Sequence, residues 1–373
     1  TDNSNVAVGA GAGYYMENVG ATNRYNTYIG TGAGNKSYKG SNQTYIGGQA
    51  GWHATGSNNT FVGKQAGYGG TTSAPFASGE NNVALGYQAL KAFTTGTKNT
   101  ILGYRAGYST TTGFTNQYIG YQAGYRNTTG RANTAIGANS QQGVSGQTTG
   151  QYNVSLGENS LFGLTTGNHN FVVGSNAGYS LTSGEHNIIM GSAAGDALTT
   201  TSNSVMIGRD AGTAINSADA NGTVLIGMSA GTALTSGIGN TAIGTSALAA
   251  EDDGDYNTAV GYAALSAQTG TAGEMGSTAM GYKAGTSLTT GKGNTLLGYD
   301  AGRYQTTQTY NTVVGWQSSK RNYKGEHRVT IGAEAGHYST GSYNTFIGSA
   351  AGQGGTTSAP FSSGQNNTAL GYQ

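Results

Sequence analysis

Histidines are the side chains in this sequence best suited to acid–base chemistry or metal binding, because histidine changes charge near neutral pH. The chain has five, which are His53, His169, His186, His327 and His337, and they are dispersed. A metal site needs several such groups to converge on one point. His169 and His186 stand 17 residues apart, so a fold of that period would make them neighbours. We interpret them as a surface pair and assign no metal to them.

Acidic residues are concentrated in the run Glu251-Asp252-Asp253-Gly254-Asp255. Carboxylate oxygens are ligands that Ca²⁺ prefers. However, the run lacks the spacing and the closing glutamate of an EF-hand loop, and the chain lacks the nonapeptide pattern of calcium-binding β-rolls. A solvated loop is the simplest interpretation of the run, and a calcium site is the alternative.

No other motif predicts an active site. Gly-x-Gly-x-Gly occurs at residues 9–13 and 30–34, but no helix is expected after either copy to bind phosphate. The sequence has no nucleophile elbow, no zinc-protease motif and no cysteine for a disulfide or a thiolate ligand. We therefore predict no catalytic residue, no cofactor and no metal, in a protein that is not an enzyme.

Two copies of a Pro-Phe segment are the best candidates for a docking surface. Pro75 and Phe76 recur as Pro360 and Phe361, and these are the only two prolines in the chain. In both copies the segment lies in an arm six residues longer than the commonest one, and proline stiffens the turn by fixing φ. Each copy is either a docking knob or a rigid clip folded over the edge of the fold.

Tyrosine is abundant, with 25 residues. Several tyrosines follow the same type of glycine, as at Tyr87, Tyr104, Tyr121, Tyr262, Tyr282 and Tyr299. An aromatic face suits a pyranose ring, so a row of them could bind sugars. We favour structural stacking of the rings on one another.

A short repeat positions all of these residues. A glycine preceded by Ile, Val, Leu or Met, which we call the anchor glycine, occurs 21 times from Gly9 to Gly371. Of the 20 intervals between anchors, 12 are 17 residues long and two are 16. Asn stands four residues before the anchor in 16 repeats, and Ala stands three residues after it in 17. Changes of length fall in the variable arm that follows, so the apolar residues keep fixed positions, which a disordered chain has no reason to do.

A longer period of 285 residues lies above the short one. Residues 61–88 and 346–373 agree at 21 of 28 positions, and the anchor spacing of residues 30–88 matches that of residues 315–373. We predict one continuous repeat region over residues 1–373. We also predict that it is a segment of a longer chain, because solenoids need atypical polar repeats to cap their ends.

The repeat predicts an all-β fold, namely a β-solenoid (parallel β-roll) with one coil of about 17 residues per repeat. Thr, Asn, Gly and Tyr at these densities oppose helix. Identical positions of successive coils would stack roughly 4.8 Å apart. We expect the stacked Asn side chains to hydrogen-bond from coil to coil. We expect the anchor glycine and the later Ala where tight turns leave no room for larger side chains.

Side chains alternate along the strand that precedes each anchor. We expect the aliphatic residue before the anchor, and the Thr two residues earlier, to point inward as an interior ladder. The residue between them, such as Tyr28, Tyr45 or Phe61, then points to the opposite face. There a neighbouring chain would cover it, since exposed apolar stripes mark interfaces. A second packed layer within one wide coil is the alternative.

The motifs resemble those of a known group of fibrous proteins. Residues 133–137 and 240–244 both read Asn-Thr-Ala-Ile-Gly. They resemble head repeats of YadA-like trimeric autotransporter adhesins, and residues 367–373 resemble repeats of phage and viral tail-fibre proteins. The resemblance covers nearly the whole chain, although the unit here is longer than in the adhesins. It implies a left-handed parallel β-roll in a side-by-side homotrimeric fibre, located extracellularly, on a cell surface or on a virion.

Together these features predict a structural fibre segment of a viral or phage tail fibre or a microbial surface adhesin, giving reach and attachment. Its partners would be itself, as a homotrimer or a longer fibre, and a glycan or protein receptor on a host surface. The net charge of +1 argues against nucleic acid, and no apolar run reaches the 18 residues of a membrane span. The alternatives are a self-assembling extracellular filament, a polysaccharide-cleaving spike, and an ice- or surface-binding solenoid. The last is suggested by Thr three residues before the anchor in 12 of 21 repeats.

Overall fold

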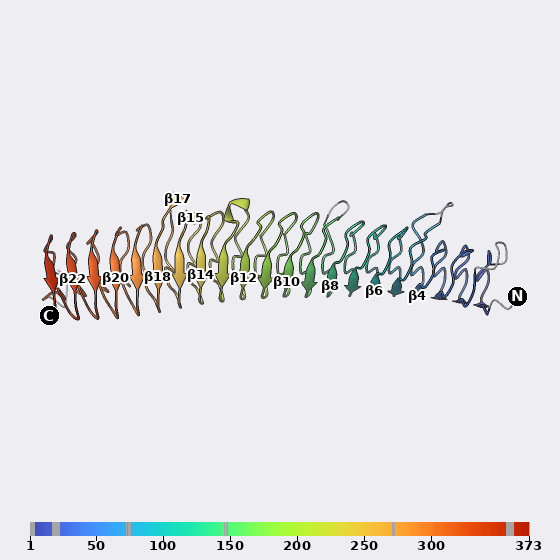
Figure 1. The fold of residues 1–373 in the computed structure, drawn as a ribbon, viewed down its shortest axis with the longest axis horizontal. Coiled ribbons are helices and arrows are strands. Elements are labelled where there is room, and N and C mark those ends of the chain that lie inside the picture. Colours follow the sequence, from blue (N-terminus) through green and yellow to red (C-terminus); the bar gives the residue numbers. More distant parts are fainter. Residues whose placement is uncertain are drawn as a thin grey trace. The chain divides into compact units, whose positions relative to one another are not determined.

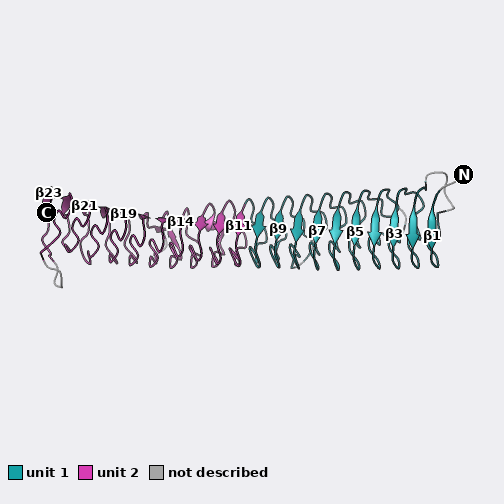
Figure 2. Cartoon of the chain, turned by 90° about the horizontal axis from the view of Figure 1, so that it is seen from below, with its two compact units in different colours: residues 1–186 teal, residues 187–373 magenta. Residues whose placement is uncertain are grey.

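The computed structural model describes residues 4–16, 23–71, 73, 76–144, 146, 148–270, 273–355 and 362–372. The chain divides into two compact units, residues 1–186 and 187–373 (Figure 2). Each unit is a parallel β-solenoid in which one short strand recurs about every 17 residues (Figure 1). The predicted all-β solenoid is confirmed.

The first unit is built on ten strands of three residues each. They are β1 Val6–Val8, β2 Thr27–Ile29, β3 Thr44–Ile46, β4 Thr60–Val62, β5 Val83–Leu85, β6 Thr100–Leu102, β7 Gln117–Ile119, β8 Thr134–Ile136, β9 Val154–Leu156 and β10 Phe171–Val173. Each strand pairs in parallel with the next, position for position, so Thr27 lies beside Thr44 and Ile29 beside Ile46. The repeat in the sequence therefore becomes rows of equivalent side chains.

The second unit continues the same pattern. Its main strands are β11 Ile188–Met190, β12 Val205–Ile207, β13 Val224–Ile226, β14 Thr241–Ile243, β16 Thr258–Val260, β18 Thr278–Met280, β19 Thr295–Leu297, β20 Thr312–Val314, β21 Val329–Ile331, β22 Thr345–Ile347 and β23 Thr368–Leu370. The arms between them carry a 3-10 turn, η2 (Ala218–Ala220), and a small parallel pair, β15 (Gly254–Asp255) with β17 (Gly273–Glu274). The variable arms thus hold the departures from the common coil.

Anchor glycines turn the chain at the end of each strand. Their φ angles lie between +123° and +139°. Residues that carry a side chain rarely adopt this backbone conformation. At Gly120 a Cβ atom would lie 2.4 Å from the carbonyl oxygen of Gly137, the next anchor. Anchors in successive coils therefore approach too closely for any side chain, as predicted. The Ala three residues after the anchor is fully buried in most coils, as at Ala106 and Ala123.

A ladder of buried Asn side chains ties each coil to its neighbours. The side-chain oxygen of Asn99 accepts a hydrogen bond of 3.0 Å from the backbone N–H of Asn116. Its amide nitrogen donates to the Asn82 side-chain oxygen at 3.0 Å and to the Gly113 carbonyl at 2.9 Å. The predicted coil-to-coil ladder is confirmed, and it also satisfies the backbone groups of the arm.

The predicted inward and outward faces of the strands are reversed. The middle residue of the strand points inward, and Tyr28, Tyr45 and Phe61 are fully buried within the coil. The expectation that these residues face a neighbouring chain is wrong, and the packed layer within one coil is what the structure has. The expectation of an interior Thr and aliphatic ladder is also wrong, because the first and third strand residues are partly exposed. Middle residues lie two positions from the buried Asn, so these two side chains share a face.

Two interior positions of each coil share one volume. One is the middle strand residue, and the other is the residue six positions later, which adopts a left-handed φ. Where the first is large, as at Phe61, the second is glycine, and a Cβ on Gly67 would lie 2.3 Å from the Phe61 ring. Where the first is small, as at Ala84, the second is Leu90. Most coils therefore fill their interior from one of these two positions or the other.

Candidate functional site

The largest regular surface is the outer strand face, which we define as the first and third residues of the strands in each unit. Third residues are aliphatic, and Ile29, Leu102 and Leu297 remain 39%, 40% and 42% exposed. First residues are mostly Thr and are also partly exposed, as at Thr100 and Thr278. None of these strand positions is Asp, Glu, Lys or Arg. Each unit thus presents an uncharged face on which a row containing many Thr residues runs beside a row of aliphatic side chains.

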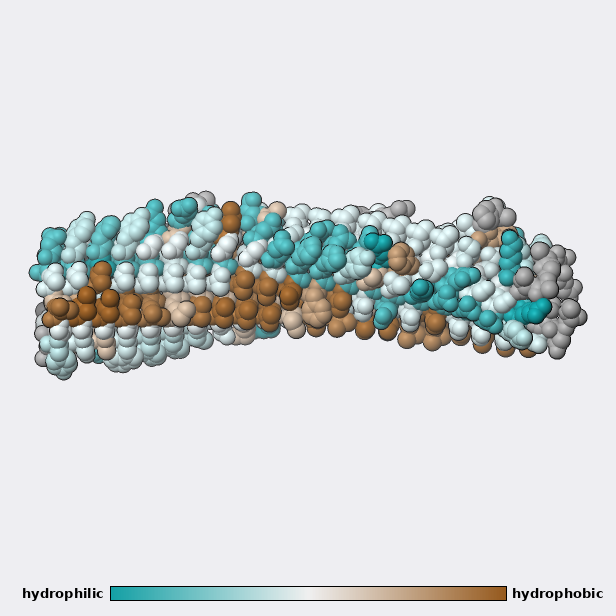
Figure 3. Space-filling view, viewed as in Figure 1, coloured by the Kyte–Doolittle hydropathy of each residue, from teal (hydrophilic) through white to brown (hydrophobic). Residues whose placement is uncertain are grey.

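Hydrophobic residues gather in a continuous band over the strands of the second unit (Figure 3). The band contains the third strand residues Met190, Ile243, Met280, Leu297, Ile331 and Ile347. A regular row at a fixed spacing differs from the scattered surface hydrophobes that soluble proteins normally carry. The sequence contained a signal for this face. The predicted Asn ladder lies two residues before the middle strand residue, so both point to the same, buried side, and the first and third strand residues must point outward.

Tyrosines after the anchors form stacked rows beside the outer strand face. Tyr87, Tyr104 and Tyr121 stack with ring centroids 5.4 and 5.2 Å apart and interplanar angles of 16° and 5°. Tyr262, Tyr282, Tyr299 and Trp316 form an equivalent row in the second unit. The rings cover one another's faces, as structural stacking requires. A ligand would meet ring edges and hydroxyl groups rather than the open faces that suit a pyranose ring.

Only one residue of the predicted docking segments can be placed. Phe76 is partly buried, with its ring centroid 5.9 Å from that of Tyr38 and 5.3 Å from that of His53. The Lys36 ammonium lies 5.2 Å from its ring centroid. Phe76 therefore packs onto the fold, as expected of a clip, while a docking role stays a prediction. Pro75, Pro360 and Phe361 lie outside the described residues.

The histidines are either exposed or buried within the coils. His169 and His186 stack as expected, with centroids 5.0 Å apart, and both are exposed. His327 is also exposed, stacked between Tyr310 and Tyr343. His53 and His337 are buried, and burial lowers the pKa of both side chains. In the described part of the chain, no histidine belongs to a group of three or more potential metal ligands.

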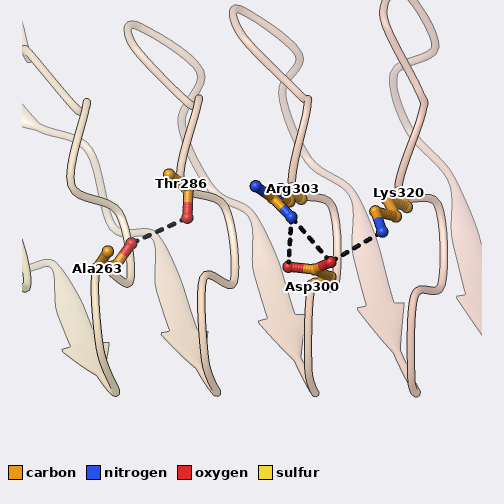
Figure 4. A network of polar contacts seen from close by, with 5 residues as sticks. All are labelled: Ala263, Thr286, Asp300, Arg303 and Lys320. Carbon is orange, nitrogen blue, oxygen red and sulfur yellow. Dashed lines mark hydrogen bonds and ion pairs between the residues drawn. The ribbon is translucent and has the colours of Figure 1, made fainter.

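One buried carboxylate is neutralised by cations from two coils. Asp300 is almost fully buried, and its carboxylate lies 3.1 Å from Arg303 in the same coil and 2.9 Å from Lys320 in the next (Figure 4). Nearby, the Thr286 hydroxyl donates to the Ala263 carbonyl of the preceding coil at 3.0 Å (Figure 4). These contacts join coils together and are structural in character.

Glu251 is the other fully buried acid among the described residues, and none of the ion pairs found there involves it. It is fully buried, so the solvated-loop interpretation is wrong for this residue. Glu251, Asp252 and Asp253 each bring a carboxylate oxygen within 4.8 Å of the others. Among the residues with described positions, this is the one group of three or more acids or histidines that could hold a metal ion.

Comparisons with known proteins found no relative that shares this geometry. Across the described ranges, no helix is long and apolar enough to cross a membrane. The sequence matches no protein-family model, and a search of curated proteins found no match.

Proposed function

We propose that this chain is a non-enzymatic structural fibre segment that self-associates through its outer strand face. The supporting observation is the half-exposed aliphatic row that follows the strands of each unit without a charge among them. Soluble monomers rarely expose contiguous apolar areas above a few hundred Å². Further copies of the chain, each with the same face, would cover it.

A side-by-side homotrimer is the arrangement we propose. Rotation about one threefold axis turns the outer strand face of every chain toward the others, and closed symmetry leaves none of these faces uncovered. The strict register of the rows within each unit allows equivalent coils to meet at the same level. Such a fibre would belong to a viral or phage tail fibre or a microbial surface adhesin, at an extracellular location. Its receptor would be a glycan or protein of a host surface.

The test is the mass of the particle in solution, followed by imaging. Sedimentation equilibrium of the wild-type chain should give three times its mass of 37.6 kDa, and cryo-EM should show threefold symmetry. Leu297→Lys places a charge on the outer strand face and should release monomers. Ile238→Lys is the matched control, because Ile238 is 40% exposed but lies in an arm. A monomeric wild-type chain, or equal effects of both variants, would contradict self-association through this face.

A second candidate function uses the same face differently. The outward Thr side chains offer exposed hydroxyl groups at a regular spacing, which an ice- or surface-binding solenoid needs. Thr241, Thr258, Thr278, Thr295 and Thr312 stand in five successive coils of the second unit. The row is broken in this unit by Ile188, Val205, Val224 and Val329, and in the first unit by Val6, Val83, Gln117, Val154 and Phe171. It is therefore less regular than the aliphatic row. We therefore place this function second.

Thermal hysteresis separates the two candidates, because an ice-binding face must be free in solution. A monomer that depresses the freezing point, and loses this activity in Thr278→Lys, would establish the second function. A trimer without thermal hysteresis would eliminate it.

A further inference from the structure

Glu251 occupies a position that several coils of the second unit fill with an aliphatic residue. This position lies seven residues after the anchor, and in those coils the arm sends a side chain into the interior, as at Leu198, Ile215, Leu234 and Leu288. Gln268 takes this place in the coil after Glu251 and is also fully buried. A carboxylate in such a row loses its hydration, so it needs hydrogen bonds or a counter-charge.

One oxygen of Glu251 is held by the backbone. Oε1 accepts hydrogen bonds from the N–H groups of Gly254, at 2.7 Å, and Gly270, at 3.0 Å. A Cβ atom on either glycine would lie only 2.6 or 2.7 Å from that oxygen. Glycine is thus required at both places for the backbone to reach the carboxylate, and the contact links two successive coils.

The other oxygen of Glu251 has no partner. Oε2 is buried without a hydrogen bond, and so is Oδ1 of Asp253. Burial raises the pKa of Glu251, and the neighbouring Asp252 carboxylate raises it further. None of the ion pairs among the described residues involves these three acids, in contrast to Asp300 with its two cations. Two buried acceptors beside an uncompensated group of carboxylates are the environment that a cation would complete.

The geometry suits Ca²⁺. Bonds of about 2.4 Å on opposite sides of one ion separate two ligand oxygens by about 4.8 Å, and the three carboxylates offer oxygens within 4.8 Å of one another. All the donors are oxygens, which Ca²⁺ prefers and Zn²⁺ does not. Asp252 is exposed, so an ion and its remaining water ligands can reach the site from solvent. Asp255 and Glu274 pair in β15 and β17 and add negative charge beside it.

We propose that Glu251, Asp252 and Asp253 form a calcium site that fastens the arm of one coil to the next. This site is independent of the proposed fibre function. Its role is to neutralise the buried Glu251 carboxylate, as Arg303 and Lys320 neutralise Asp300.

Calcium titration of the chelator-treated full chain tests the proposal. Calorimetry should detect one Ca²⁺ per chain, and Ca²⁺ should raise the unfolding temperature. Tb³⁺, which takes calcium sites and is excited by nearby tyrosine, should luminesce through Tyr256, which follows Asp255. Glu251→Gln should weaken binding roughly tenfold or more, because ligand charge sets calcium affinity. That variant should still fold, because Gln268 is accommodated in the equivalent place.

The control is Asp219→Asn, which removes one exposed acid from the η2 arm of the same unit. It should bind Ca²⁺ as the wild type does. Asp253→Asn gives a second test at another ligand, should Glu251→Gln fail to fold. The proposal would be overturned if Ca²⁺ did not raise the unfolding temperature of the wild type. It would also be overturned if Ca²⁺ raised the unfolding temperature of Glu251→Gln and Asp253→Asn as much as that of the wild type, or if Mg²⁺ acted on the wild type as strongly as Ca²⁺.

Discussion

The anchor glycines are the residues on which the coil depends most directly. Their φ angles and the approach of the next anchor act together, so a side chain there is both strained and in collision. Some other glycines have only the first constraint. Gly222 has a φ of +76° and no atom within 4 Å of the place where a Cβ would stand. Comparing the two kinds separates the cost of backbone strain from that of coil contact.

Gly208→Ala should lower the free energy of unfolding by about 2–4 kcal/mol, because strain adds to a clash. The new Cβ would lie 2.4 Å from the Gly227 carbonyl oxygen. Gly222→Ala should cost about 1–2 kcal/mol, from the left-handed backbone alone. Chemical denaturation of both variants measures the difference, and equal losses would show that contact between anchors is unimportant.

Burial of His337 should make stability fall in mild acid. Burial lowers its pKa, Lys320 and Arg321 lower it further, and Glu334 acts in the opposite direction. The unfolded chain takes up a proton near the ordinary pKa of about 6.5, while the folded chain resists it until lower pH. Neutral His337 therefore contributes to the free energy of unfolding above about pH 6.5. This contribution is lost as the pH falls through the pKa that His337 has in the folded chain.

Unfolding midpoints measured between about pH 7.5 and 5 test this expectation. His337→Gln should flatten the pH dependence. His327→Gln, which removes an exposed imidazole from the same unit, is the control. A slope that is unchanged in His337→Gln would show that this histidine does not carry the effect.

At the scale of the coil, sequence variation follows interior volume. Ile101 and Gly107, Tyr118 and Gly124, and Ser155 and Leu161 follow the rule seen at Phe61 and Ala84. The rule fails in coils where both residues are small, which are those of Ala7 and Gly13, Ala279 and Gly285, and Thr330 and Gly336. In the last of these coils the buried Arg328 side chain approaches within 2.7 Å of the place of a Gly336 Cβ. Different residues thus fill the interior in different coils, as close packing requires.

A double mutation that exchanges the two positions should restore stability. Phe61→Ala should cost about 3–5 kcal/mol through the cavity it leaves. Gly67→Leu alone should also destabilise, because a Cβ there would lie 2.3 Å from the Phe61 ring. Combined, they reproduce the Ala84 and Leu90 arrangement and should recover about 2 kcal/mol or more in a double-mutant cycle. Additive losses would mean that the two positions do not share one volume.

The fold class was predictable from the sequence, whereas the buried side of the strand was not predicted correctly. Fixed spacing of anchors with length changes confined to arms implies stacked coils, and the Asn ladder followed from the same reasoning. Alternation in a three-residue strand shows which side chains share a face, but it does not show which face is buried. A row of aliphatic residues fits either a core or an interface, so it did not decide between the two. The position of Asn99 relative to Ile101 held the answer, since both are fully buried and two residues apart. Glu251 was missed because burial depends on where the arm folds back, which varies between repeats.

At the scale of the whole molecule, contacts are local along the chain. Each main strand contacts only the strands of the coils before and after it within its unit. Stability in such an array is a sum of coil terms and nearest-neighbour interfaces. A mutation that destabilises one coil should therefore lower the stability of the adjacent coils most and leave distant coils of the same unit little changed.

Hydrogen exchange should show this directly in Gly208→Ala. Amides of β12 and β13, which flank the altered anchor, should exchange faster than in the wild type. Amides of β20–β22, in the same unit, should keep wild-type protection. Uniform loss of protection across the second unit would indicate that it unfolds as one cooperative block instead.

The parallel strand register has a mechanical consequence. In each unit the hydrogen bonds between strands point along the stacking direction, as between β6 and β7, where residues pair one to one. A pulling force along that direction loads the interfaces in series, so the weakest coil yields first. Each coil that peels away would release roughly 50 Å of chain while its neighbours stay wound. Under load the protein would therefore lengthen in steps, as an extensible tether that absorbs work before it parts.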